Sequence, residues 1–388
     1  MKKKIAILGS TGSIGKTTFN ILKKDKKNFE IVLLTTDKNI KVLFKQTKVF
    51  NVKNLIINNK KFFLKSKKKF KNKKINIFNN FNSFNKTFKS KIDYTMCSIS
   101  GIAGLKPTLN AIAFSKTVAI ANKEALICGW NLIESRLKKY KTTFIPVDSE
   151  HFSIWSLIKG SKNDNIEKII ITASGGPFLN SSLKLLSNVN PKAAIKHPNW
   201  SMGKKISVDS ATMMNKVFEV IEAQRIFNIN FNKFKILIHP KSYVHAIVKF
   251  SSGLIKVLIH DTNMRIPIFN TIYNEKNKKI ITKDLNINLL NNLNFTEVNK
   301  KKFPVVDILK KIPQKNSLFE TILVSSNDKL VDMFFKKKIK FIEISKFLRK
   351  ILSLKEFQKY KHIKPKNFNQ IANLDKFVRL KIETLRIL

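Results

Sequence analysis

Residues 5–24 read IAILGSTGSIGKTTFNILKK, and this stretch predicts the fold of the amino-terminal part of the chain. Ile5–Leu8 is a short apolar strand, Gly9–Gly15 is a glycine-rich turn, and Lys16–Lys24 has the composition of a helix. The backbone N–H groups of such a turn and a helix N-terminus form a cradle for the pyrophosphate of a dinucleotide. The glycine spacing is Gly-x-x-Gly-x-x-Gly rather than the commoner Gly-x-Gly-x-x-Gly, so a purely structural turn stays open as the alternative.

Further apolar segments continue this alternation of strands and helices. We expect strands at Glu30–Leu34, Asp93–Ser98 and Thr117–Ala121, and a helix across Pro107–Phe114. Alternation at this spacing predicts a parallel, doubly wound sheet, in which ligands gather at the carboxyl ends of the strands. The expected fold class is therefore α/β, with a Rossmann-like amino-terminal domain.

A second stretch, His197–Ala223, reads HPNWSMGKKISVDSATMMNKVFEVIEA and predicts a polar site. We expect a helix from about Asp209-Ser210, because either residue is a good N-cap. Four polar residues then share one helical face: Asn215, Lys216, Glu219 and Glu222. A solvated helix face with i,i+4 ion pairs is the alternative, but the apolar residues around Val217 argue for a buried helix.

The segment Pro146–His151, PVDSEH, supplies further carboxylates. Thr143–Val147 reads as a strand, and Asp148 and Glu150, two residues apart at its end, are expected to point the same way. Together with Glu219 from the helix, they would form an oxygen-ligand site suited to Mg²⁺ or Mn²⁺. No cysteine or multi-histidine cluster in the sequence argues for zinc instead.

The charge of the chain is extreme, with 75 Lys and Arg against 25 Asp and Glu in 388 residues, a formal net charge of +50. Such a balance ordinarily suggests a nucleic acid or an anionic surface as partner. Only six of the basic residues are Arg, and the Lys residues are spread along the chain among Asn, Ile and Phe. We therefore expect a solvated, compositionally biased surface and no specific nucleic acid, while a nucleic-acid-binding protein stays open as an alternative.

Cysteine usage and hydropathy indicate the compartment. Cys97 and Cys128 are too few for a disulfide framework, which fits a reducing cytoplasm. The start, MKKKIAIL, has only four apolar residues, fewer than the apolar region of a signal peptide. Charged or amide side chains interrupt every longer apolar run, so we expect a soluble cytoplasmic protein without a membrane partner.

Four motifs occur together and in order: VDSEH at 147–151, SGGPF at 174–178, HPNWSMG at 197–203 and KISVDSATMMNK at 205–216. With them the chain closely resembles the 1-deoxy-D-xylulose 5-phosphate reductoisomerase family. The resemblance is dense over residues 1–20 and 93–272, sparse over 40–90 and faint beyond 300. It implies an NADP-dependent oxidoreductase of non-mevalonate isoprenoid biosynthesis, which rearranges and reduces this sugar phosphate to 2-C-methyl-D-erythritol 4-phosphate with NADPH.

The resemblance also implies roles for individual residues. A divalent ion, Mg²⁺ or Mn²⁺ with Co²⁺ as a further candidate, would be held by Asp148, Glu150 and Glu219. These three, with Lys123 and His197, would be the catalytic residues. The substrate would be bound by Lys123, Ser149, Glu150, Ser174, His197, Ser210, Asn215, Lys216 and Glu219. NADPH would be bound by Thr11, Gly12, Ser13, Ile14, Lys38, Asn39, Asn122, Glu124 and Gly203.

Two residues depart from the family pattern. Asp37 stands where the family usually has glycine, near the expected adenosine ribose. A carboxylate there would repel a 2′-phosphate, whereas it would bind a free 2′-hydroxyl. Val217 stands where a glycine commonly follows Asn-Lys, and its extra bulk would shift the helix slightly without removing a ligand.

The expected domains are an NADPH-binding domain at 1–148, a catalytic and dimerisation domain at 149–273, a linker at 274–302 and a helical domain at 303–388. A flap at about 174–204, with Trp200 as its lid, would close over the substrate. Strands at 235–239, 243–250 and 254–260 read as an antiparallel meander, which in the family contributes to a homodimer. A semialdehyde-dehydrogenase-like oxidoreductase is a further alternative, but it needs an activated cysteine, and neither cysteine has a histidine nearby in sequence.

Overall fold

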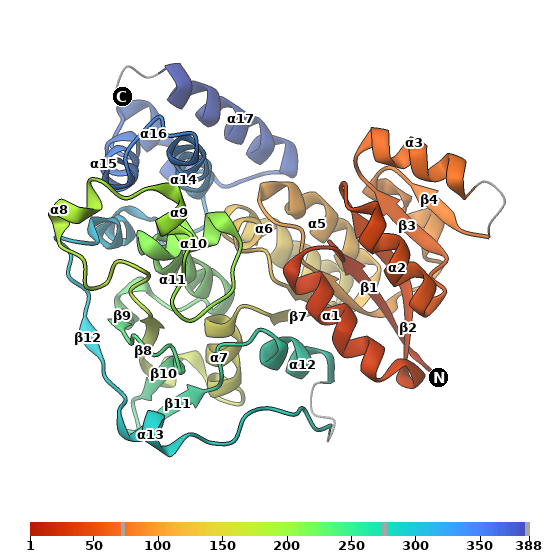
Figure 1. Cartoon of the computed structure of the whole chain (residues 1–388), viewed down its shortest axis with the longest axis horizontal. Coiled ribbons are helices and arrows are strands. Elements are labelled where there is room, and N and C mark those ends of the chain that lie inside the picture. The colour runs from red at the N-terminus through yellow and green to blue at the C-terminus, as the bar shows by residue number, and fades with distance from the viewer. Residues whose placement is uncertain (71–73, 274–277, 385–388) are drawn as a thin grey trace. The chain divides into compact units, whose positions relative to one another are not determined.

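A computed structural model describes residues 1–70, 74–273 and 278–384, which fall into two compact units, each described here by itself (Figure 1). The first unit contains Met1–Ala125, Asn131–Asp148 and Met264–Ile280. The second contains Leu126–Trp130, Ser149–Asn263 and Ile281–Leu388. The main division thus falls between Asp148 and Ser149, while Met264–Ile280 groups with the first unit; the finer domain limits given above stay a prediction.

The first unit is built on a sheet whose strand order in the described residues is β4-β3-β2-β1-β5-β6-β7. All of its pairings are parallel, which confirms the predicted α/β class. The strand order reverses on either side of β1, and such a reversal is where open α/β sheets bind ligands. The strands are β1 Lys3–Leu8, β2 Phe29–Thr36, β3 Asn54–Ile57, β4 Asn76–Phe78, β5 Ile92–Cys97, β6 Ser115–Ile120 and β7 Thr143–Pro146.

Helices connect these strands and pack on the sheet through its apolar side chains, among them Ile5, Ile7 and Leu34, which are fully buried. The helices are α1 Ser13–Lys24, α2 Ile40–Phe50, α3 Lys60–Lys69, α4 Phe84–Thr87, α5 Leu105–Ala113, α6 Lys123–Tyr140 and α12 Arg265–Tyr273. Helices α3 and α4 and strand β4 lie within residues 40–90, where the resemblance to the family is sparse.

The turn between β1 and α1 depends on glycine. Gly9 has φ of +80°, in the left-handed region that favours glycine. A Cβ at Gly15 would lie 2.3 Å from the carbonyl oxygen of Gly9, so only glycine allows the helix to come this close. The helix begins at Ser13, earlier than the expected Lys16, because the glycine turn is shorter than its sequence pattern indicated.

The second unit contains a sheet of order β11-β10-β8-β9-β12. Its strands are β8 Ile166–Ala173, β9 Phe234–Ile238, β10 Val244–Phe250, β11 Ile255–Ile259 and β12 Thr296–Glu297. The predicted meander is wrong for the first of its strands, because β9 pairs with β8 in parallel, and β10 pairs with the other edge of β8. The apolar strand β8 takes the central position between them, and only β10 and β11 form an antiparallel hairpin.

Helices make up the rest of the second unit, and the predicted helical character of its carboxyl-terminal part is confirmed (Figure 1). Helix α14 packs against α15 and α17 there. The helices are α7 Ser149–Ile158, α8 Leu183–Leu186, α9 Pro191–Ala194, α10 Lys204–Ala211, α11 Met214–Phe227, α13 Ile287–Asn291, α14 Phe319–Phe335, α15 Phe341–Ile351, α16 Lys355–Gln358 and α17 Phe368–Thr384, with a 3₁₀ helix at Pro304–Lys311.

Three local expectations need correction. The single helix predicted from Asp209 is two helices, α10 and α11, separated at Met213, whose φ of +68° no helix can contain. The predicted flap loop includes the short helices α8 and α9. The expected linker includes α13 and β12, while its residues 274–277 lie outside the described residues. In the described part of the chain, no helix combines the length and apolarity needed to cross a membrane.

Candidate active site

The polar site of the second unit begins at helix α7. The sequence placed Asp148 and Glu150 on one side of a strand end, but β7 ends at Pro146 and Glu150 lies in the first turn of α7. A carboxylate is stabilised there by the helix dipole. The hydroxyl of Ser149 donates a hydrogen bond to Glu150 Oε2 at 2.6 Å, and both residues are buried.

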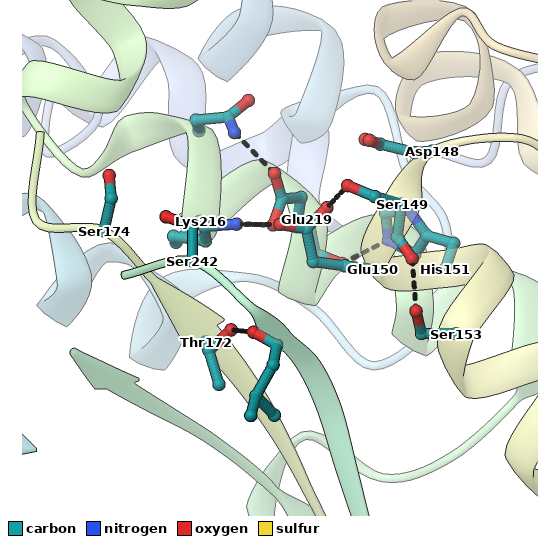
Figure 2. Close-up of polar contacts among 12 residues, drawn as sticks. Asp148, Ser149, Glu150, His151, Ser153, Thr172, Ser174, Lys216, Glu219 and Ser242 are labelled. Carbon is teal, nitrogen blue, oxygen red and sulfur yellow. Dashed lines mark hydrogen bonds and ion pairs between the residues drawn. The ribbon is translucent and has the colours of Figure 1, made fainter. Parts of the chain in front are cut away.

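Helix α11 contributes the centre of the site. The ammonium of Lys216 lies 2.6 Å from Glu219 Oε2 and also forms an ion pair with Glu150 Oε1 (Figure 2). Glu150 is 7% exposed, Glu219 1% and Lys216 8%, so three charges share one buried location. Burial alone would lower the pKa of Lys216, but the two carboxylates outweigh it and raise that pKa, which keeps the ammonium charged. Asn215 donates a further hydrogen bond to Glu219 Oε1.

This arrangement has the donors of a divalent metal site. Two buried carboxylates cannot both stay ionised side by side without a cation, and here the Lys216 ammonium supplies one positive charge. Asp148, the last residue of its segment of the first unit, directly precedes Ser149 in the chain, so it is next but one to Glu150 in sequence. Within the first unit, Asp148 pairs with Lys123 at 2.6 Å. Within the second unit, the structure thus brings two of the predicted carboxylates, Glu150 and Glu219, together around Lys216, and hard oxygen ligands of this kind suit Mg²⁺ or Mn²⁺.

Ser174 and His197 form a second polar pair. The Ser174 hydroxyl lies 2.9 Å from Nε2 of His197, whose Nδ1 accepts the backbone N–H groups of Asn199 and Trp200 at 3.2 and 3.0 Å. Since Nδ1 accepts, the proton of the neutral ring is on Nε2, which donates to Ser174 Oγ. Burial, reinforced by the charge of Lys216 and opposed by that of Glu150, lowers the pKa of His197 to about 4. His197 is therefore a neutral hydrogen-bond donor near pH 7.

Ser210 does not lie at a helix N-terminus as predicted but in the last turn of α10. The loop that follows β8 reaches it: a Cβ on Gly176 would lie 2.9 Å from Cα of Ala211 and 3.0 Å from the carbonyl oxygen of Ser210. The Ser174–Gly176 loop therefore packs directly on the end of α10. The loop that carries Ser174 and the helix end that carries Ser210, which come from two separate sequence motifs, therefore lie against each other.

The segment that carries Trp200 is fixed by residues to which the sequence assigned no role. Asn199 donates hydrogen bonds to the carbonyl oxygen of Pro240 and, at 2.9 Å, to the hydroxyl of Ser242. Trp200 meets the ring of His245 edge-on, with 6.0 Å between centroids. His245 in turn stacks on His260 at 3.7 Å. The histidine of β10, a strand that is apolar apart from His245 and Lys249, was the local signal for this contact.

Glu222, on helix α11, is buried in the interior of the second unit. It was assigned no ligand role, yet its carboxylate is buried and lies 3.5 Å from Nδ1 of His151. His151 Nε2 lies 2.8 Å from the backbone oxygen of Glu219. Glu222 is thus part of the interior of the site and would be a poor neutral control in mutagenesis.

The residues predicted to contact a nucleotide lie mainly at the strand ends of the first unit. Thr11 shares a hydrogen bond of 2.7 Å with Thr36, and Gly12 is the N-cap of α1, followed by Ser13 and Ile14. Lys38 is exposed, and Asn39 caps α2 through Val42. Asn122 caps α6 and also donates to the backbone of the β5–α5 loop, so its side chain organises that loop; Glu124 lies in the first turn of α6. Gly203, the remaining predicted contact, is the N-cap of α10 in the second unit.

Family comparisons cover most of the chain. The family model of 1-deoxy-D-xylulose 5-phosphate reductoisomerase matches residues 5–129, and that of the C-terminal domain of this enzyme matches residues 144–227. A third model, the DXP reductoisomerase C-terminal domain, matches residues 260–381. A 1-deoxy-D-xylulose 5-phosphate reductoisomerase of Pelagibacter ubique (strain HTCC1062) is 59% identical over 99% of this chain and 100% of its own length. One of Wolbachia sp. subsp. Brugia malayi (strain TRS) is 36% identical over 96% and 95%.

Solved structures resemble the fold over its whole length. The reductoisomerase from Zymomonas mobilis in complex with NADPH has 32% identity and a TM-score of 0.89, covering 100% of both chains. A DOX-P reductoisomerase in complex with NADPH, fosmidomycin and magnesium has 29% identity and a TM-score of 0.90, covering 98% of this chain and 97% of that one.

Proposed function

Because this chain belongs to the 1-deoxy-D-xylulose 5-phosphate reductoisomerase family, we propose that it converts 1-deoxy-D-xylulose 5-phosphate to 2-C-methyl-D-erythritol 4-phosphate with NADPH and a divalent metal ion. The observation that carries the proposal is the buried group of Glu150, Glu219 and Lys216. Such a group has little structural reason to exist, since apolar side chains of the same volume would be as stable or more stable.

The carboxylates of Asp148, Glu150 and Glu219 would hold the metal ion. When bound, it supplies Lewis-acid stabilisation of substrate oxygens on which negative charge develops. Lys216 is the counter-charge of two of these carboxylates, which supports the proposal that positive charge is stabilised at this location. We assign Lys216 a second task as donor to the substrate phosphate, together with Asn215 on the same face of α11.

The phosphate of the substrate would be bound by Ser174, Ser210, Asn215 and Lys216, whose hydroxyl, amide and ammonium groups are all donors. His197 would donate from Nε2 on the same side, since its low pKa keeps it neutral. It would orient the substrate rather than supply a proton. Ser149, which lies between Asp148 and Glu150 in the chain, and Lys123, which pairs with Asp148, would hold the hydroxyl groups near the reacting carbons.

NADPH would be bound at the reversal of strand order in the first unit. Gly12 has no side chain that could cap α1, so the first N–H groups of that helix can face a pyrophosphate. Thr11, Gly12, Ser13 and Ile14 line this turn, while Lys38 and Asn39 follow β2, where the ribose of a nucleotide is expected. Asn122, Glu124 and Gly203 complete the proposed contacts.

A homodimer and a cytoplasmic location belong to the same proposal. Strand β11 is the edge of its sheet among the described residues, and apolar side chains on and before it are exposed, namely Leu254, Ile255 and Val257. An exposed apolar edge strand favours pairing with a second copy of the chain. The two buried thiols, Cys97 and Cys128, fit a reducing compartment.

The two alternatives have less support. A semialdehyde-dehydrogenase-like mechanism needs a thiolate, but Cys97 and Cys128 are buried, and burial raises the pKa of Cys97 to about 12. A nucleic-acid-binding protein would explain the charge of +50 but not the buried carboxylates. We propose that nucleic acid binds only weakly at physiological salt and leaves turnover unchanged.

The direct test is NADPH oxidation with 1-deoxy-D-xylulose 5-phosphate, measured with Mg²⁺, with Mn²⁺ and after chelation of metal. We expect turnover that chelation abolishes and either ion restores. Absence of turnover in the metal-loaded protein, with product also absent by mass spectrometry, would overturn the proposal.

A further inference from the structure

A chain of charged residues connects the end of α10 to the carboxyl-terminal helices. Asp209, next to Ser210, is 1% exposed and pairs with Lys205 at 3.0 Å one turn earlier in α10. The amide of Asn327, in α14, donates to Asp209 Oδ1 at 2.7 Å. Burial raises the pKa of Asp209, and Lys205 and Asn327 oppose this by stabilising the charged form.

The chain continues through α14 into α17. Lys205 Nζ also forms an ion pair with Asp328 Oδ1 at 2.9 Å, although the geometry of this contact is not that of a hydrogen bond. Arg379, in α17, forms ion pairs with Asp328 at 3.0 Å and with Asp375 at 2.7 Å. The hydroxyl of Ser325 also donates a hydrogen bond to Asp375 at 2.7 Å. Helix α10 is therefore held by alternating charges from two other helices.

The position of this network relates it to substrate binding. Ser210 directly follows Asp209, and the loop carrying Ser174 packs on the same end of α10 through Gly176. The segment with His197 and Trp200 leads into the start of α10 at Gly203. A small movement of α10 would displace phosphate donors from two motifs at once, and misplaced donors bind a phosphate less tightly.

We propose that Asp328 and Lys205 are positioning residues, through which α14 and α17 hold α10 and so set the geometry of the phosphate site at Ser174 and Ser210. This inference rests on the proposed function, since it assumes that these serines bind the substrate phosphate. The sequence assigned nothing to Asn327-Asp328, and neither residue needs to contact the substrate. Their effect is carried by Asp209 and Lys205.

The test compares Asp328→Asn, which removes the charge, with Asp328→Glu, which retains it. Asp332→Asn is the matched control, because Asp332 lies on the same helix in an exposed ion pair with Lys336. We expect Asp328→Asn to raise the KM for the sugar phosphate and the inhibition constant of inorganic phosphate in parallel by about tenfold. Asp328→Glu should recover most of this loss, and the KM for NADPH and the kcat should stay close to those of the parent protein.

Lys205→Met supplies a second variant in case Asp328→Asn does not fold. It keeps an aliphatic stem, which preserves packing near the ring of Phe218, 5.1 Å from the ammonium. A merely structural role would lower the melting temperature without raising the KM of the phosphate substrate in folded protein. Unchanged KM and phosphate inhibition in folded Asp328→Asn and Lys205→Met would overturn the inference.

Failure of the proposed function has a different signature. In that case the parent protein itself would show no turnover, while binding of inorganic phosphate, measured by calorimetry, would still compare the variants. Weaker phosphate binding by Asp328→Asn than by Asp332→Asn would then support the positioning role alone. Equal phosphate binding by the two variants would reject it.

Discussion

In the first unit, the turn between β1 and α1 offers backbone N–H groups and depends on glycines, whereas in the second unit the site gathers buried ionised side chains. Gly15 allows a backbone approach that any Cβ would prevent, but no charge is buried in the turn itself. Lys216 is buried with the carboxylates of Glu150 and Glu219; its charge stabilises both carboxylates, and theirs stabilise the ammonium. Function should therefore depend on backbone shape at the glycine turn of the first unit, and on charge at the buried site of the second unit.

The largest effect should come from removing one charge of the second region. Glu219→Gln is nearly isosteric, but it removes one of the two carboxylates that pair with Lys216 and a proposed metal ligand. We expect turnover to fall by about 10²-fold or more, while NADPH binding, proposed to lie mainly in the first unit, changes little. Steady-state kinetics and a nucleotide titration measure both.

Glu167→Gln is the matched control for this substitution, because Glu167 lies on β8 in an exposed ion pair with Lys249. Glu222→Gln is not a neutral control, since Glu222 is buried beside His151. Near-normal metal-dependent turnover of Glu219→Gln would reject the assignment of Glu219.

Acid should destabilise the second unit before the first, because all six histidines are in the second unit. Burial, the stacked His260 and the charge of Lys216 lower the pKa of His245 to about 3, with Glu150 opposing. The folded state thus favours the neutral ring. The contribution of His245 to the free energy of unfolding is therefore fully present above the pKa of the unfolded state, about 6.5, and is lost as the pH falls from there toward 3. At pH 5 the loss should be about 2 kcal/mol for this group alone.

Urea unfolding followed by tryptophan fluorescence measures this effect, because Trp130, Trp155 and Trp200 all belong to the second unit. His245→Gln should flatten the acid side of the stability curve. A parent protein whose stability does not change between pH 7 and pH 5 would contradict the prediction.

The same contrast explains what the sequence could predict. The strand, turn and helix at the start of the chain are local, so Ile5–Leu8 and the glycine spacing were sufficient to indicate them. The break at Met213 was not predictable, because a methionine with positive φ leaves no mark in the sequence. Likewise, the insertion of β8 between β9 and β10 depends on pairing between distant segments.

The site shows the same division. Motif spacing and family resemblance indicated Glu150, Glu219 and Lys216, and the structure brings these side chains together. They did not indicate that Lys216 would lie between the carboxylates, nor that His245 would stack on His260, since both contacts join residues far apart in the chain or in different elements. Contacts between side chains of different elements could therefore not be predicted from the sequence.

The shape of the glycine turn can be tested by Gly15→Ala. The added Cβ would lie 2.3 Å from the Gly9 oxygen and 2.6 Å from Cα of Ser10, so the backbone must move. We expect the KM for NADPH to rise by about tenfold and the protein to lose about 1–3 kcal/mol of stability, as overpacking usually causes. Asn20→Ala, an exposed change on the same helix, is the control, and equal behaviour of the two variants would show that the turn tolerates a side chain.

The smallest effect concerns Asp37, a charged residue in the first unit, where function should depend mainly on backbone shape. Asp37 and Lys38 are both exposed after β2, near the expected adenosine ribose. A carboxylate would repel the 2′-phosphate of NADPH, but an exposed side chain can turn toward water while Lys38 pairs with that phosphate, so NADPH should still be preferred. Asp37→Gly should then improve the KM for NADPH by about threefold and leave that for NADH unchanged, since exposed charges contribute little. Lys38→Ala should have the opposite effect on NADPH. Two results would contradict this assignment: turnover of the parent protein with NADH as high as with NADPH, or an equal improvement of both KM values in Asp37→Gly. The Asp37 carboxylate would then bind the free 2′-hydroxyl of the ribose, and NADPH would not be the preferred cofactor.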